Sequence, residues 1–136
     1  MNKHSTEPAQ DVALIIGGGP GISSSCARLF AERGMRVAIA ARDPDKAVLR
    51  NLEKTHNVRR YGCDASEPTA VELLFQDVVR DLGTPTLVVH NIDGRTAGIF
   101  RKGIAEADPS MAFETLRNSA FSAFLVAQQA ARLMRE

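Results

Sequence analysis

Residues 12–23 read Val-Ala-Leu-Ile-Ile-Gly-Gly-Gly-Pro-Gly-Ile-Ser. The apolar run 12–16 predicts a strand that is buried on both faces, and the glycines after it predict a tight turn that opens into a helix. Residues without a Cβ let the backbone approach an anion closely, and the free N–H groups at a helix N-terminus attract negative charge. The junction therefore suits the pyrophosphate of a dinucleotide.

The glycine spacing departs from the G-x-G-x-x-G fingerprint of such sites. Gly17, Gly19 and Gly21 alternate, and Pro20 lies between the last two. A plain glycine turn in an α/β domain is therefore the alternative interpretation of this cluster alone. A Walker-type phosphate loop is excluded because no Gly-Lys-Ser/Thr follows the glycines.

Composition indicates one ordinary globular domain. The chain has 136 residues, of which 44% are hydrophobic and 24% charged, with a formal net charge of +1. This charge gives no reason to expect nucleic acid or an anionic membrane as a partner, and no apolar run is long enough to span a bilayer. Cys26 and Cys63 lie far apart without metal-ligand spacing, so we expect reduced, structural thiols, no metal site and a cytoplasmic protein. Residues 1–10 are polar and predict a disordered tail before a domain over 11–136.

Strand and helix patterns alternate along the chain. Apolar runs predict strands over 12–16, 35–41, 58–63 and 85–90, and helical spacing or caps predict helices over 22–33, 43–52, 66–82 and 108–136. Asp43 and Pro44 are interpreted as the cap and first turn of the second helix. With right-handed crossovers, this order predicts a three-layer, Rossmann-type, doubly wound parallel sheet with strand order 3-2-1-4. The glycines, Arg42, Asp64 and Asn91 follow strand ends and would meet at one rim of that sheet.

The last helical segment carries more apolar residues than contact with a sheet requires. One stripe comprises Phe113, Leu116, Ala120, Phe124, Ala127, Ala131 and Met134, and a second includes Phe121 and Leu125. We interpret the surplus as an interface between copies of the chain, and a fully buried core helix is the alternative.

The residues at the end of the second predicted strand indicate which dinucleotide cofactor the chain prefers. In dinucleotide folds an acid there binds the ribose 2′-hydroxyl, whereas an arginine accommodates a 2′-phosphate. This chain has Ala41 and then Arg42, which favours NADP(H) over NAD(H). The alternative is that Arg42 is a solvated loop charge.

At this point the chain resembles the short-chain dehydrogenase/reductase family over nearly all of its length after the tail. The glycine turn 17–23 is similar to the family's T-G-x-x-x-G-I-G, and Cys63-Asp64 to its Asp-Val position after the third strand. His90-Asn91-Ile92-Asp93 stands where the family has N-N-A-G, and the segment from Phe121 through Met134 resembles its long interface helix. Ile16 in place of the usual Thr, and Ser23 in place of the last Gly of the turn, resemble a divergent branch with a G-x-G-P-G turn.

The resemblance implies contacts for a cofactor. The pyrophosphate would lie against Gly17, Gly19, Gly21 and Ile22, the 2′-phosphate against Arg42, the adenine against Asp64, and another edge of the cofactor against Asn91. The family's helix asparagine aligns with Ser119, and Asn118 is one residue away.

The family's catalytic Ser and Tyr-x-x-x-Lys lie beyond a helix like the one at 108–136. The single tyrosine, Tyr61, has no lysine four residues later. We therefore expect residues 1–136 to be the N-terminal cofactor-binding part of a longer reductase, inactive by itself. His90, at a strand end, is a candidate general base only as a minor interpretation, since only Asp93 is near it in sequence as a carboxylate partner.

Three classes of function stay open. The first is an NADP(H)-dependent oxidoreductase acting on a small carbonyl or alcohol. The second is a non-catalytic nucleotide-binding or assembly module of the same fold. The third is a methyltransferase-like domain, against which Ala41 and Arg42 argue because an acid is expected there. The exposed edge of the fourth strand predicts self-association through residues 108–136, or marginal stability if these residues are the whole molecule.

Overall fold

The computed structural model of the chain describes residues 10–135 and has a four-stranded parallel sheet at its centre. The strands are β1 (Val12–Ile16), β2 (Arg36–Ala41), β3 (Arg59–Gly62) and β4 (Leu87–His90). Their order is β3-β2-β1-β4, and Ile15 of β1 pairs with Ile39 on one side and Val89 on the other. The predicted strand order is confirmed. The predicted tail at 1–10 lies outside the described residues except for Gln10.

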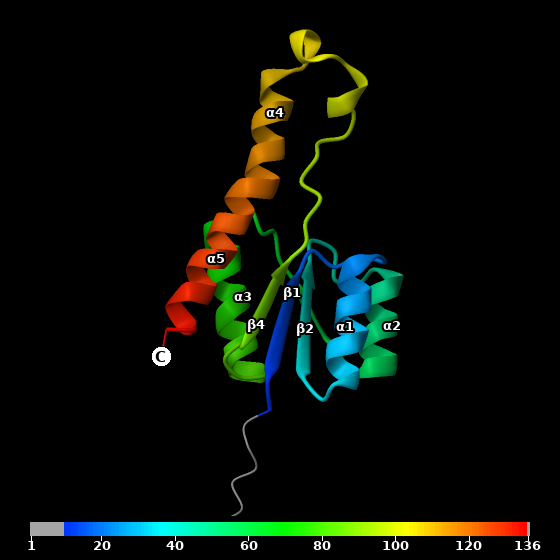
Figure 1. Cartoon of the computed structure of the whole chain (residues 1–136), viewed down its shortest axis with the longest axis vertical. Helices are drawn as coiled ribbons and strands as arrows, with labels where there is room; N and C mark the ends of the chain where they lie inside the picture. The colour runs from blue at the N-terminus through cyan, green and yellow to red at the C-terminus, as the bar shows by residue number, and fades with distance from the viewer. Residues whose placement is uncertain (1–9, 136) are drawn as a thin grey trace, which may run out of the picture.

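Helices cover both faces of this sheet. They are α1 (Ile22–Glu32), α2 (Ala47–His56), α3 (Pro68–Asp81), α4 (Pro109–Leu116) and α5 (Ser122–Leu133). Two 3₁₀ turns (Ile99–Arg101 and Ile104–Glu106) precede α4, and a π-helical segment (Arg117–Phe121), here called the π segment, joins α4 to α5. Figure 1 shows α1 and α2 on one side of the strands and α3 and α5 on the other, which confirms the three layers.

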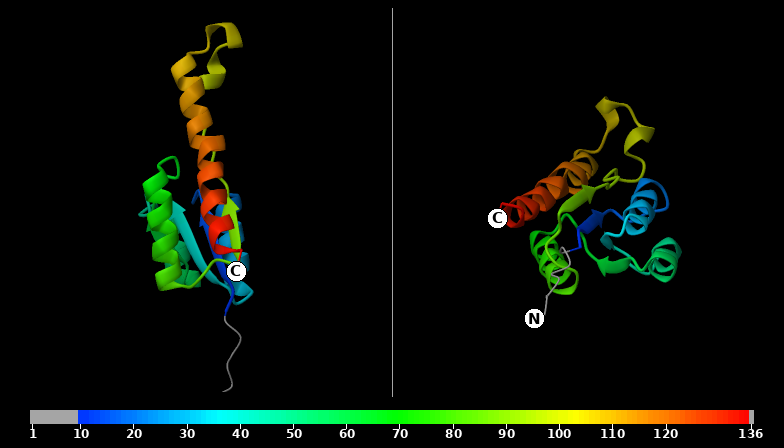
Figure 2. Two further views of the ribbon diagram at one scale, coloured as in Figure 1. Left: turned by 90° about the vertical axis from the view of Figure 1, so that its left-hand side faces the viewer. Right: turned by 60° about the horizontal axis from the view of Figure 1, so that its bottom comes forward.

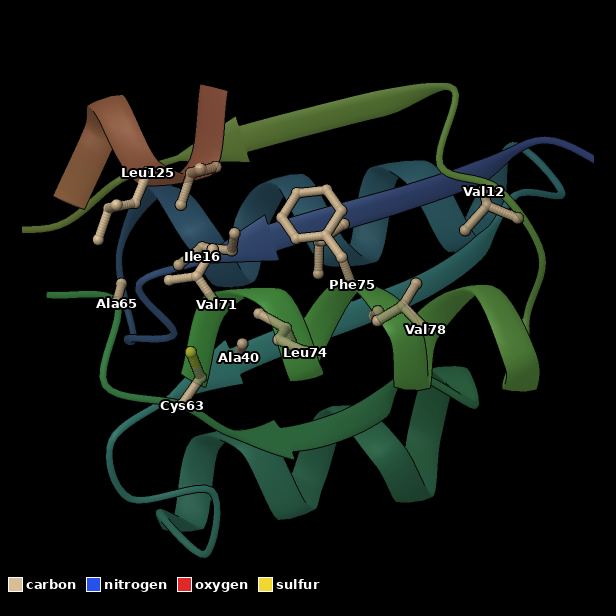
Figure 3. Packing of buried hydrophobic residues seen from close by; sticks show 13 residues of the cluster. Val12, Ile16, Ala40, Cys63, Ala65, Val71, Leu74, Phe75, Val78 and Leu125 are labelled. Atoms are coloured by element: carbon tan, nitrogen blue, oxygen red, sulfur yellow. The ribbon is translucent and has the colours of Figure 1, made fainter. Parts of the chain in front are cut away.

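Alternation along β1 explains why its five residues are all buried. Leu14 and Ile16 belong to the hydrophobic cluster under α3 and α5, whereas Ala13 and Ile15 belong to the cluster under α1 and α2. Figure 3 shows the first cluster, with the Phe75 ring of α3 lying against the sheet. A strand with helices on both faces has no solvent side, so an uninterrupted apolar run is the sequence pattern that suits it.

Small residues form the buried side of α1. Ser23, Ser24 and Ala27 are buried, while Ile22 and Leu29 are 66% and 47% exposed. The helix is where its apolar spacing predicts it, but the side that packs is set by small side chains: Ser23 and Ser24 bond to the glycine turn, and Ala27 packs in the cluster under α1 and α2.

The predicted start of α2 is wrong. The Asp43 carboxylate accepts a hydrogen bond from the Asp45 N–H at 2.9 Å, and the helix begins only at Ala47, after Lys46. Asp and Asn side chains bond readily to backbone two residues on, so Asp43 and Pro44 form a turn here. This extra turn brings Lys46 to the carboxyl edge of the sheet.

The long helix predicted over 108–136 consists of three successive helical segments, of which the middle one is π-helical. Its start is confirmed, because the Asp108 carboxylate accepts from the Ser110 N–H at 2.8 Å. The π segment then interrupts the α-helical bonding, although α4 and α5 still form one rod that projects beyond the sheet (Figure 2). Leu125 and Val126 of α5 are buried against the core, whereas the apolar residues nearer α4 are exposed.

Candidate cofactor-binding site

A cavity of about 260 Å³ opens at the carboxyl ends of the strands. Every strand contributes residues that follow its last position, because the ends of parallel strands meet at one edge. The lining includes Gly17 and Gly18 after β1, Arg42 and Lys46 after β2, Asp64 after β3, and Asn91 after β4. Gly19, Gly21 and Ile22 lie outside this lining, farther along the same turn.

The glycines of the turn serve two purposes. Gly17 has φ +104°, and a Cβ there would lie 2.1 Å from the Asn91 carbonyl oxygen, so only glycine lets the turn pass the end of β4. A Cβ at Gly19 or Gly21 would meet nothing within 4 Å. These two positions therefore leave open space beside the backbone, as close approach of a phosphate requires.

Side-chain donors hold the carbonyl groups of the turn. The hydroxyl of Ser23 donates to Gly17 O at 2.8 Å, and that of Ser24 donates to Gly19 O at 2.7 Å. Lys46 Nζ donates to Gly18 O at 3.3 Å. The first N–H groups of α1 have no intrahelical acceptor, so the junction keeps donors for an anion while its acceptors are already bonded.

Ser23 also connects the turn to β4. Its hydroxyl oxygen accepts from Asn91 Nδ2 at 3.0 Å, and the residue is 1% exposed. In the sequence Ser23 is a departure from the family's glycine, and its linking role became visible only in the fold.

Two cations border the cavity on the β2 side. Arg42 Nη2 donates to Asn118 Oδ1 at 2.8 Å, and Arg42 Nε lies 3.5 Å from Asp64 Oδ1. Lys46 is a second positive charge that the sequence analysis missed. The one feature that points to Lys46 in the sequence is its position four residues after Arg42. Because the sequence pattern places this stretch in a helix, it does not predict that Lys46 reaches the cavity.

Asp64 is held as a carboxylate. Partial burial raises its pKa, but hydrogen bonds from the Ser66 hydroxyl and N–H, at 2.8 and 3.0 Å, and the charges of Arg42 and Arg117 outweigh that effect. The net result is a pKa below the usual range of an aspartate. A negative acceptor thus lies beside the guanidinium of Arg42.

The structure distinguishes the two positions proposed for the helix asparagine. Asn118 lines the cavity. Ser119 instead packs against Gly94, where a Cβ would lie 2.6 Å from Ser119 N, and its hydroxyl donates to Thr115 O at 2.6 Å. The residue at the aligned position is therefore used in packing, and its neighbour faces the site.

His90 supports the π segment. Its Nε2 lies 2.8 Å from Ser122 Oγ, which lies 2.7 and 2.9 Å from the carbonyl oxygens of Asn118 and Ser119. The single hydroxyl proton of Ser122 goes to a carbonyl, so we assign the proton between the two side chains to Nε2 of His90. Burial lowers the pKa of His90, which keeps the ring neutral. These contacts indicate a structural role.

Tyr61 and Cys63 are poorly suited to proton transfer at neutral pH, although Cys63 lines the cavity. The Tyr61 hydroxyl donates to Asp81 Oδ2 at 3.1 Å, and burial together with that carboxylate raises the pKa of Tyr61 to about 12. Cys26 and Cys63 are free thiols, and burial with the nearby Asp64 charge raises the pKa of Cys63 to about 11. Within residues 10–135 no cluster of His, Cys, Asp and Glu suits a metal ion, and no helix there is long and apolar enough to cross a membrane.

Comparison with known proteins identifies relatives of this chain. A family model described as enoyl-(acyl carrier protein) reductase matches residues 17–136. An uncharacterized oxidoreductase of Caenorhabditis elegans is 37% identical over 93 residues, covering 61% of this chain and 28% of that protein. The mouse 3-oxoacyl-[acyl-carrier-protein] reductase is 30% identical over 93 residues, covering 68% of this chain and 37% of that protein.

Solved structures are similar to this chain over a longer stretch than the curated relatives are. A short-chain type dehydrogenase/reductase from Mycobacterium marinum superimposes with a TM-score of 0.81 at 26% identity, covering 91% of this chain and 50% of the other. The actinorhodin polyketide ketoreductase, solved with NADPH, has a TM-score of 0.81 at 25% identity, covering 92% and 48%. The chain thus spans about half the length of these structures and about a third of the length of the curated relatives.

Proposed function

Because the chain belongs to the short-chain dehydrogenase/reductase family, we propose that it is the NADP(H)-binding part of an oxidoreductase that acts on a small carbonyl or alcohol. The observation that carries this proposal is the pair of cations, Arg42 and Lys46, at the β2 edge of the cavity. An acid at that edge would repel a 2′-phosphate, and this chain has Ala41 there.

The residues present fit a dinucleotide. Gly17, Gly19, Gly21 and Ile22 would hold the pyrophosphate, since the turn is open beside two of its glycines and α1 begins at Ile22. Arg42 and Lys46 would bind the 2′-phosphate, Asp64 the adenine, and Asn91 another edge of the cofactor. When bound, the nicotinamide supplies the hydride donor or acceptor.

Arg42 suits a phosphate better than a point charge does. Its planar guanidinium offers paired N–H donors that match two phosphate oxygens. The side chain is 60% exposed, so it can turn toward a ligand at small cost. Lys46 adds charge from the start of α2 without competing for the same geometry.

Proton transfer is proposed to need residues other than these 136. Tyr61 bonds to Asp81, and the residue four positions later is Ala65 rather than a lysine. With a pKa near 12 it is a poor general acid or base at neutral pH. We propose that the catalytic Ser and Tyr-x-x-x-Lys of the family are absent from this chain and that it does not turn over by itself.

We further propose that the chain forms a homo-oligomer through residues 108–136, in the cytoplasm. Exposed apolar side chains along α4 and α5 support the first part. Two free thiols are typical of a reducing compartment and support the second.

A second candidate is a non-catalytic nucleotide-binding or assembly module. It is favoured by the packing of Ser119 against Gly94, since the family's helix asparagine position then carries no amide toward the site. This candidate shares the cofactor site with the first and differs in turnover.

Titration of the 136-residue chain with NADPH and with NADH tests the cofactor proposal. We expect NADPH to bind more tightly, and Arg42→Ala to weaken NADPH binding by about 10- to 100-fold because a charged hydrogen-bond pair to the phosphate is lost. NADH binding should change little. Calorimetry or cofactor fluorescence gives both constants.

Arg50→Ala is the matched control, because Arg50 is an exposed arginine of α2 outside the cavity lining. Equal affinity for both cofactors, unchanged by Arg42→Ala, would contradict the NADP(H) preference. Failure of both cofactors to bind would contradict the dinucleotide site itself.

A further inference from the structure

The hydrogen bond between Arg42 and Asn118 joins the β2 edge of the cavity to the π segment. The two residues are 76 positions apart in sequence, and both line the cavity. Nη2 of Arg42 donates to Asn118 Oδ1 at 2.8 Å, while Nε lies 3.5 Å from Asp64 Oδ1. Neither partner adjoins Arg42 in the chain, so the fold alone brings them together.

These contacts use one of the guanidinium edges that a phosphate can use. Nε and Nη2 form one of its paired-donor edges, and such an edge binds two oxygens of one phosphate. Asn118 Oδ1 and Asp64 Oδ1 are two oxygens already placed along it. A phosphate that binds Arg42 in this way must displace both.

We propose that Asn118 is a specificity-determining residue, whose amide oxygen competes with the cofactor's 2′-phosphate for Arg42 and so reduces the preference for NADPH over NADH. This inference rests on the proposed function. NADH carries no 2′-phosphate and leaves the Arg42–Asn118 bond in place, so the competition acts on NADPH alone.

The placement of Asn118 is a property of the π segment. The carbonyl oxygen of Asn118 accepts from Ser122 Oγ at 2.7 Å, and His90 lies 2.8 Å from the same hydroxyl. The backbone that carries the amide is therefore tied to β4 through the Ser122 hydroxyl and His90. A partner that is already ordered competes without paying for its own ordering.

The competition is modest in size. Arg42 is 60% exposed, so its contacts are made against water and a phosphate can replace them. A solvent-exposed hydrogen bond from the guanidinium to an uncharged amide oxygen, at an ordinary net strength, corresponds to roughly two- to tenfold in a binding constant. Lys46 is bonded to Gly18 O rather than to Asn118, so its contribution to phosphate binding stays the same in either state.

Two substitutions at Asn118 have opposite expected effects. Asn118→Ala frees Arg42 and should tighten NADPH binding about two- to tenfold with NADH binding unchanged. Asn118→Asp replaces the amide by a carboxylate, which holds Arg42 more strongly and repels the phosphate, so NADPH binding should weaken relative to NADH. Isothermal titration of the full chain with each cofactor measures the ratio.

Asn51→Ala makes the same chemical change at an exposed position of α2 and should leave both affinities unchanged. In an Arg42→Ala background, Asn118→Ala should have no effect on NADPH binding, because the guanidinium for which Asn118 and the 2′-phosphate compete is absent. Thermal melts accompany each variant, and Asn118→Ser takes the place of Asn118→Ala if the alanine variant does not fold.

NADPH affinity that is unchanged or weaker in folded Asn118→Ala would overturn the competition, and so would an equal tightening of NADH. Both results leave the cofactor site intact. Absence of NADPH binding to the unmodified chain overturns the proposed function, and the competition falls with it.

Discussion

Ser23 joins two parts of the site, which its position in the glycine turn does not by itself indicate. Its hydroxyl donates to Gly17 O and accepts from Asn91 Nδ2, and the side chain is 1% exposed. One small residue thus links the glycine turn to the end of β4. A glycine at this position would give the same close packing without the two hydrogen bonds.

Ser23→Ala should lower the free energy of unfolding by about 1–2 kcal/mol, because a half-buried carbonyl of Gly17 and a half-buried amide of Asn91 lose their partner. Urea unfolding followed by circular dichroism measures the loss. Ser25→Ala, at an exposed position two residues later, should stay within about 0.5 kcal/mol of the unmodified chain. Equal effects of the two substitutions would contradict the linking role.

At the scale of elements, the π segment decides which side chains of the long helix reach the cavity. It places Asn118 in the cavity lining and Ser119 against Gly94. The Ser122 hydroxyl lies within hydrogen-bonding distance of two carbonyl groups of the π segment, and His90 supports that hydroxyl from β4. Strand and helix are therefore coupled through one imidazole.

This coupling predicts a pH dependence of stability. Burial lowers the pKa of His90, so the folded chain binds fewer protons than the unfolded chain near neutrality. The contribution is fully present above the unfolded pKa of about 6.5 and is lost as the pH falls from there through the lowered pKa of the folded state. The free energy of unfolding should fall between pH 7.5 and 5 by up to about 1.4 kcal/mol per pH unit.

His90→Gln should flatten this pH profile in chemical denaturation, since glutamine donates a hydrogen bond but does not titrate. His56→Gln, a substitution in α2, should retain the decline. A profile unchanged by His90→Gln would show that another group sets the slope. The aspartates with lowered pKa, such as Asp64, act at lower pH and leave this window clear.

At the scale of the whole molecule, two surfaces of the described residues lack a covering layer. β4 is an edge strand of the sheet. Along α4, the π segment and α5, large apolar side chains are exposed: Phe113 68%, Leu116 60%, Phe121 41%, Phe124 56% and Met134 41%. Figure 1 shows α4 projecting past the carboxyl ends of the strands, away from the core. Several large apolar side chains exposed along one element are typical of an interaction site.

We therefore expect the 136-residue chain to associate with itself, with a mass that rises with concentration in light scattering. Phe124→Glu should weaken this association by at least about tenfold, because a charge replaces an aromatic contact at the interface. Leu73→Glu is the matched control, since Leu73 is an exposed apolar residue of α3, 52% accessible, outside residues 108–136. A monodisperse monomer at all concentrations would contradict the prediction.

The alternation of strands and helices, their order in the sheet and the rim where residues after each strand meet were predictable from residues 12–90. These features depend on local periodicity and on general rules of chain crossover, which act on short stretches. The apolar run Val12–Ile16 is buried on both faces of the sheet, and among alternating strands and helices a parallel sheet covered by helices on both faces is the arrangement that buries it.

The contacts inside the site required the folded chain. Lys46 reaches the cavity because Asp43 caps a turn instead of a helix, and local propensity does not distinguish these two uses of Asp-Pro. Asn118 faces Arg42 because a π segment shifts the phase of the helix, and that segment depends on His90 and Gly94 of a distant stretch. Sequence patterns report what neighbouring residues prefer, whereas these positions follow from packing between residues that are far apart in the chain.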